Sequence, residues 1–217
     1  MSVRKSRVVT LGNVITSISR GIQLSADELE QCTTDKETGY RYLSLADMRE
    51  EASLQLNTEG LRRFDPSILG KNVDQYCLQP DMILITKNDT PFKIDIAGGL
   101  DDEKIIVSGN IYMISADKEK VIPRWLCYWL QSEEGMSRLR SAAASTNNGR
   151  MKWISIKQIS GIVIPDLSFQ QQADLLIAKI REYSRWMERV TREFRRNSNE
   201  IFEILKALGI TEPQEHE

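Results

Sequence analysis

The sequence predicts a mixed α/β (α+β) domain followed by one long C-terminal coiled-coil helix. Two observations carry this prediction. Residues 1–165 hold several short apolar runs separated by turn-forming residues, together with an apolar helix, whereas residues 166–209 hold an unbroken heptad pattern. Residues 210–217 are acidic and polar and are expected to form a disordered tail.

The heptad pattern is the strongest signal in the chain. From Phe169 onward, apolar or aromatic residues recur in alternating steps of four and three. The residues predicted to form a dimer seam are Leu176, Ile180, Tyr183, Met187, Val190, Phe194, Asn197, Ile201, Ile204 and Leu208. Such a pattern is typical of a helix that packs lengthwise on another helix, and this one would span roughly 60 Å. A domain of this size cannot cover so long a rod, so the seam predicts a partner.

Asn197 is the only polar residue of the seam and has two interpretations. A polar seam residue fixes register and partner number where it meets its counterpart, at a cost in stability. Alternatively, Asn197 is exposed to solvent where the coiled coil frays. The helix is expected to begin at Ser168, with Gln171 completing a capping box, and to end before Gly209.

Composition indicates an ordinary cytoplasmic protein without a membrane span or signal peptide. The chain has 217 residues, of which 41% are hydrophobic and 28% charged. A net charge of −2 means that any DNA-binding face has to be local. Three widely spaced cysteines favour reduced thiols rather than a metal site, and the one histidine, His216, lies in the tail, which excludes a histidine-based catalytic centre.

Short strands and two helices are expected within the domain. The expected strands are 8–11, 39–45, 81–86, 92–97, 105–107 and 110–114, and the expected helices are 123–130 and 136–144. Segments 25–38, 87–91 and 145–150 are expected to be loops or turns because polar and turn-forming residues dominate them. Segment 153–159 is a short helix or strand, and 53–72 has no clear pattern, a loop being the default.

Two of these polar loops carry side chains that suit DNA. Arginine and lysine bind phosphates and guanine, asparagine binds adenine, and glycine lets the backbone approach closely. The predicted DNA-binding residues are Arg41, Lys87, Asn88, Thr90, Lys93, Asn147, Asn148, Arg150 and Lys152. Taken alone, each loop is more often a plain solvated loop than a DNA-binding one.

Arginines of the long helix line a face away from the seam. They are Arg181, Arg185, Arg189, Arg192 and Arg196. Glutamates alternate with them along the chain, which favours a solvated, salt-bridged flank of a coiled coil. The alternative interpretation is a docking face for a further subunit or for a DNA backbone.

Enzyme chemistry is indicated only by one weak pattern. Asp81, Asp102 and Lys104 match the loose proline-aspartate…acid-x-lysine pattern of metal-dependent nucleases, in which two carboxylates and a lysine hold Mg²⁺ and a water. Such triplets are common on surfaces, and 101–104 is expected to be a hairpin turn. The chain has neither a glycine-rich phosphate loop nor an amino-methyltransferase signature. The sequence therefore predicts a chain without catalytic residues, metal or cofactor of its own.

The order of short motifs along nearly the whole chain is fairly specific. They are LGNV at 11–14, RG at 20–21, YLSLADM at 42–48, DMILI at 81–85, NIY at 110–112, IPRWL at 122–126, LQS at 130–132 and IVIPDL at 162–167, followed by QQ at 171–172. This order resembles one half of the specificity (S) subunit of type I restriction-modification systems. Two departures are Pro80, where the family usually has glycine, and Leu167-Ser168, which replace a second proline.

The resemblance implies a DNA target-recognition domain over residues 1–165 and a dimerisation helix over 166–209. A full S subunit has two such domains whose long helices pack antiparallel. A second copy in a homodimer, or a different half-subunit, would complete the seam here. By two-fold symmetry a homodimer would read an inverted repeat with a fixed spacer.

The same resemblance implies further partners. A methyltransferase (M) subunit would bring S-adenosylmethionine and methylate adenine, and a restriction (R) subunit would be a further partner. This chain would select the DNA site, and the M and R subunits would catalyse the reactions there. An alternative is a decoy that docks on the M subunit without reading DNA.

Overall fold

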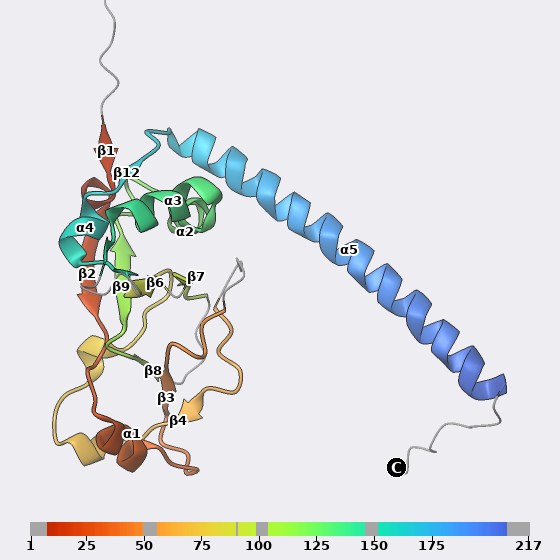
Figure 1. Ribbon diagram of the computed structural model, residues 1–217, viewed down its shortest axis with the longest axis horizontal. Helices are drawn as coiled ribbons and strands as arrows, with labels where there is room; N and C mark the ends of the chain where they lie inside the picture. Colours follow the sequence, from red (N-terminus) through yellow and green to blue (C-terminus); the bar gives the residue numbers. More distant parts are fainter. Residues whose placement is uncertain (1–7, 50–55, 90, 99–103, 146–151, 208–217) are drawn as a thin grey trace, which may run out of the picture. The chain divides into compact units, whose positions relative to one another are not determined.

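The computed structural model describes residues 8–49, 56–89, 91–98, 104–145 and 152–207 and divides the chain into two compact units (Figure 1). The first unit, Met1–Ala173, contains the described strands and the shorter helices. The second, Asp174–Glu217, contains most of the long helix α5 (Phe169–Ala207). The mixed α/β fold and the long C-terminal helix expected from the sequence are therefore both present.

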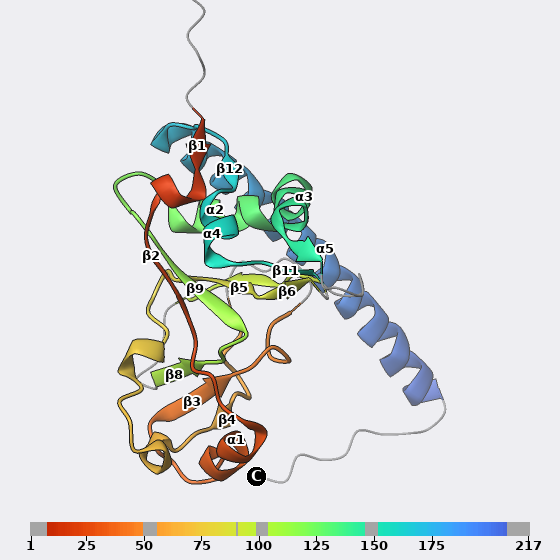
Figure 2. The same cartoon turned by 60° about the vertical axis from the view of Figure 1, so that its left-hand side comes forward.

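Two sheets frame the first unit (Figures 1 and 2). The larger is antiparallel, and its strands in spatial order are β2 (Ile15–Arg20), β9 (Ile111–Ala116), β5 (Ile83–Thr86) and β7 (Ile94–Ile96). The smaller contains β4 (Arg62–Arg63), β3 (Tyr40–Leu43) and β8 (Lys104–Val107), with β3 and β8 parallel.

One hydrophobic core joins these two sheets. Leu84 and Met113 of the larger sheet pack in the same cluster as Leu43 and Val107 of the smaller sheet. Every residue of β5 is buried, as its continuous apolar run predicts for a central strand. A second cluster packs on Tyr42 and Ile106 of the smaller sheet, so both faces of that sheet are covered.

Gly21 lies where the chain passes from β2 toward the smaller sheet. Its N–H donates to the carbonyl of Ile111, and the next N–H, of Ile22, donates to the carbonyl of Val107. A Cβ at residue 21 would lie 2.1 Å from the carbonyl oxygen of Val107, so no larger side chain fits there.

Three short helices lie between β9 and α5 in the sequence. Helix α2 (Pro123–Gln131) begins with proline at its first turn, as expected, and its Trp125, Leu126 and Leu130 are buried. Helix α3 (Glu133–Ala142) is capped by Ser132. It begins three residues before the expected start at 136. Helix α4 (Ile156–Ser160) begins in a capping box, and β1 (Val9–Thr10) pairs with β12 (Val163–Ile164), joining the two ends of the unit.

Three segments differ from the expectation of loop or turn. Segment 25–38 contains helix α1 (Ala26–Cys32), because Ser25 and Glu28 form a capping box and Cys32 is buried. Segment 53–72 contains β4 and a 3₁₀ helix (Pro66–Leu69), and a further 3₁₀ helix follows at Asp74–Tyr76. Segment 87–91 contains β6 (Asn88–Asp89), which pairs with β11 (Lys152–Trp153).

All three cysteines are buried and form no disulfide bond in the structure. Burial raises the pKa of each thiol above its ordinary value. Among the described helices, none combines the length and the apolar character that a membrane crossing requires. The expected tail, 210–217, lies outside the described residues.

Candidate nucleic-acid interface

The two polar loops predicted to bind DNA are brought together in one small sheet. Strand β6 pairs with β11, and β11 pairs with β10 (Ala144–Ser145), all antiparallel. In this register Asn88 lies opposite Trp153, and Asp89 lies opposite Lys152. Two segments that are far apart in the sequence therefore form one element, which we call the ribbon (β6, β10 and β11).

The core of the unit holds the ribbon in place from both sides. The N–H of Ile154 donates to the carbonyl of Lys87, 3.0 Å away, and the buried hydroxyl of Tyr112 donates to the carbonyl of Ile154 at 2.8 Å. The buried hydroxyl of Thr86 donates to the carbonyl of Asn88 and accepts from the N–H of Lys93. The hydroxyl of Thr86 thus ties both ends of the segment between Asn88 and Lys93 to β5.

Lys87, Asn88 and Lys152 are the predicted DNA-binding residues that the structure brings together. All three side chains are half-buried, so their apolar stems are covered while surface remains exposed. Thr90, Asn147, Asn148 and Arg150 lie outside the described residues.

Lys93 and Arg41 lie apart from the ribbon and bind the protein's own backbone. The Lys93 ammonium donates to the carbonyls of Leu45 (3.2 Å) and Met48 (2.8 Å). The Arg41 guanidinium, on the smaller sheet, donates to the carbonyl of Leu61 at 3.3 Å. These contacts brace loops of the fold, a role that the residue types alone did not reveal.

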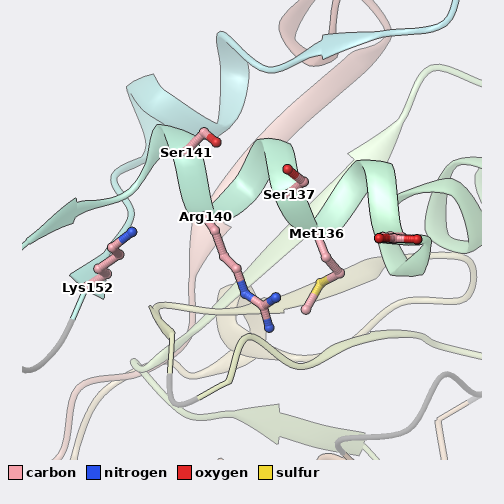
Figure 3. A pocket seen from close by; sticks show the side chains of 6 residues that line it. Met136, Ser137, Arg140, Ser141 and Lys152 are labelled. Atoms are coloured by element: carbon pink, nitrogen blue, oxygen red, sulfur yellow. The ribbon is translucent and has the colours of Figure 1, made fainter.

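Two further residues, Trp153 in the ribbon and Arg140 beside it, were not among the predicted DNA-binding residues. Trp153 is 40% exposed, a large aromatic surface on β11. Arg140 of α3 lines a pocket of about 360 Å³ together with Lys152 of β11. The other lining residues are Glu133, Met136, Ser137 and Ser141 (Figure 3). Arg140 lies within the predicted helix 136–144, but only the register of β11 places it beside a predicted DNA-binding residue.

The N-terminal end of helix α3 is fixed by its cap, and this sets the position of the residues that line the pocket. The Ser132 hydroxyl accepts from the N–H of Gly135, and Glu133 and Glu134 occupy the first turn, where acids favour the helix dipole. Leu139 is fully buried and sets which side of the helix faces inward. Arg138, on another side, forms an ion pair with Glu134 at 2.7 Å and does not line the pocket.

The start of α5 is anchored on the first unit. Ser168 and Gln171 form the predicted capping box, with the N–H of Ser168 donating to the Gln171 side chain at 2.9 Å. Gln172 is 3% exposed; its carbonyl oxygen accepts from the N–H of Ile122 (2.8 Å) and its amide donates to the carbonyl of Leu167 (2.9 Å). Both polar ends of this buried side chain are therefore satisfied.

Beyond this anchor, the seam is uncovered. Ile180, Tyr183, Met187 and Val190 are between 39% and 42% exposed, and Phe194 is 71% exposed. Leu176 is half-buried and Asn197 is exposed. Ile201 and Ile204 lie on α5 with side chains that are not described, and Leu208 lies outside the described residues. The large side chains at heptad spacing between Ile180 and Phe194 are therefore exposed in this chain.

The arginine face of α5 is exposed and lies opposite the seam. At about 100° per residue, the five arginines fall within an arc of about 80°. Within the part that the structure describes, Arg181, Arg185, Arg189 and Arg192 form no ion pair, so the expected pairs with glutamate are not seen for these four. Lys179 and Glu182 do form one, at 3.1 Å.

The set expected of a nuclease is not assembled by the described residues. Asp81 forms an ion pair with Lys118 at 2.6 Å, whereas Lys104 forms one with Asp74 at 2.8 Å. This hydrogen bond to Asp74 raises the pKa of the Lys104 ammonium. Asp102 lies outside the described residues, and those that are described include no group of three acids, cysteines or histidines able to hold a metal ion.

No protein-family model matches the sequence, and a search of curated proteins found no match. Solved structures of type I restriction-modification (R-M) proteins do match. A chain from work on complex assembly and conformational transition of the type I R-M system has a TM-score of 0.58 at 15% identity, over 95% of this chain and 45% of that one. The S subunit from M. genitalium has a TM-score of 0.51 at 12% identity, over 92% and 45%.

The HsdS subunit from Thermoanaerobacter tengcongensis has a TM-score of 0.55 at 15% identity, over 89% of this chain and 41% of that one. This chain therefore spans less than half the length of each of these three chains. The chain therefore shares the fold of less than half of a type I S subunit, a mixed α/β unit followed by a long C-terminal helix.

Proposed function

We propose that this chain is a DNA-recognition subunit of a type I R-M system. The observation that carries the proposal is the ribbon, which joins the two loops predicted from the sequence to bind DNA. A narrow β-ribbon fits the major groove of B-DNA, where bases are distinguished by their hydrogen-bonding groups. Lys87, Asn88, Lys152 and exposed Trp153 supply donors, an acceptor and an apolar surface on or beside the ribbon. The shared fold with S subunits supports the same assignment.

The uncovered seam supports pairing with a second helix. A second copy of this chain would cover it in an antiparallel pair and place two recognition domains at opposite ends of a rod. Such a pair has two-fold symmetry, so it would read an inverted repeat whose spacer is set by the helices. A different half-subunit with a matching seam would form the same rod and read two unrelated half-sites.

In this scheme the chain contributes recognition and other subunits contribute chemistry. An M subunit would carry S-adenosylmethionine and methylate adenine, and an R subunit would join for cleavage. The exposed arginine face of α5 is available for such a subunit while the seam is occupied, because the two faces lie on opposite sides of the helix.

Selection from a random duplex library tests the proposal. The purified chain is expected to enrich an inverted repeat with one spacer length. Asn88→Ala is expected to relax preference at one base pair in each half-site, at a cost of roughly 1–3 kcal/mol of discrimination. Asn72→Ala is the matched control, because Asn72 is an exposed asparagine outside the ribbon.

Failure to enrich any sequence, from a folded chain, would overturn the proposal. If that chain still bound an M subunit, the decoy interpretation would replace it. Enrichment of a single unrepeated half-site would leave recognition in place and reject the symmetric pair.

A further inference from the structure

We propose that the pocket between α3 and β11 binds a backbone phosphate of DNA, so that Arg140 and Lys152 position the duplex while the rest of the ribbon reads it. This inference rests on the proposed DNA-recognition function. It adds a phosphate site and a residue, Arg140, that the two polar loops do not contain.

The pocket gathers cationic and hydroxyl donors from two elements. Arg140 comes from α3 and Lys152 from β11, and Ser137 and Ser141 lie on α3 (Figure 3). Met136 and Arg140 are four residues apart and project from the same side of the helix in Figure 3, so the methionine gives the arginine stem an apolar neighbour. Guanidinium, ammonium and hydroxyl groups are the side-chain groups that bind phosphate oxygens.

One acid, Glu133, lines the same pocket. It is in the first turn of α3, seven residues before Arg140, which corresponds to roughly 10 Å along the helix axis. This acid makes the pocket a modest phosphate site, suited to one contact among several along a duplex.

The register of the ribbon separates this site from the base-reading side. Successive side chains of a strand point to opposite faces, so Lys152 and Trp153 face different sides of β11. Asn88 is paired with Trp153 and lies on its side. Lys152 thus lies on the side of the ribbon that lines the pocket with α3, and Asn88 and Trp153 lie on the other side. A contact through Arg140 and Lys152 would therefore be separate from the contacts of Asn88 and Trp153, and phosphate contacts position a protein on DNA while base contacts specify the sequence.

The salt dependence of binding to a duplex without a preferred site measures this phosphate contact. Each lost phosphate contact lowers the slope of log K against log salt by about 1, or about fourfold in affinity between 50 and 200 mM salt. We expect this reduction per chain for Arg140→Ala and for Lys152→Ala. Arg140→Lys keeps the charge and is expected to keep the slope.

Matched controls separate the pocket from general charge and folding effects. Arg138→Ala removes an arginine from another side of the same helix, and Lys157→Ala removes an exposed lysine of α4. Both are expected to leave the slope at the parent value.

Competition with inorganic phosphate at fixed ionic strength shows whether the pocket takes a phosphate of the DNA backbone or a free phosphate ion. We expect phosphate to compete weakly with DNA on the parent and not on Arg140→Ala. If the parent selects a DNA sequence but the Arg140 and Lys152 variants keep the parent slope, the phosphate site is wrong while the recognition function stands. If the parent selects none, the recognition function itself has failed.

Discussion

At the scale of single residues, the same side-chain type has different roles that only the fold distinguishes. Lys93 and Lys152 both follow a polar loop and were predicted together as DNA-binding residues. The ammonium of Lys93 is bound by two backbone carbonyls, whereas Lys152 lines an open pocket beside Arg140. Sequence reasoning found the loops because their composition is unusual, but the partner of an individual lysine depends on contacts with residues more than forty positions away.

Replacing Lys93 tests this division of roles. Lys93→Met keeps the aliphatic stem and removes the donor to two carbonyls, so we expect the free energy of unfolding to fall by roughly 1–3 kcal/mol. The salt dependence of DNA binding is expected to stay at the parent value. Urea unfolding and a salt titration measure the two quantities. A reduced slope without a loss of stability would show that Lys93 contacts DNA.

At the scale of elements, local patterns predicted those with strong periodicity. The helix from Ser168 onward, the apolar helix at Pro123 and the buried strand β5 were all found close to the expected bounds. Helix α1 was missed because polar composition hid the capping box of Ser25 and Glu28. Strand β6 was missed because its partner, β11, is more than sixty residues away in sequence and nothing local specifies that pairing.

The buried amide of Gln172 is predicted to hold the start of α5 on the first unit. Gln172→Ala would leave the N–H of Ile122 and the carbonyl of Leu167 without their partner, so we expect a loss of roughly 1–3 kcal/mol in unfolding free energy. Gln171→Ala is the comparison, because Gln171 is an exposed member of the capping box; its loss is expected to cost about 0.5 kcal/mol. Equal effects in urea unfolding would contradict the anchoring role of Gln172.

At the scale of the whole molecule, the exposed seam and the ribbon are the two features on which the proposed half of a symmetric DNA reader rests. The seam was predictable because heptad spacing is visible in one sequence, and its exposure in the structure agrees with the expected need for a partner. The ribbon was predictable only as two separate loops. The identity of the second helix is a property of another chain or another copy, so no residue here encodes it alone.

The mass of the purified chain in solution tests the central claim of pairing through the seam. We expect a dimer for the parent and a monomer for Met187→Glu combined with Phe194→Glu, because each glutamate would place a charge in the apolar contact. Ala178→Glu, on the arginine face, is expected to remain a dimer. A monomeric parent, or a double variant that stays dimeric, would contradict the account.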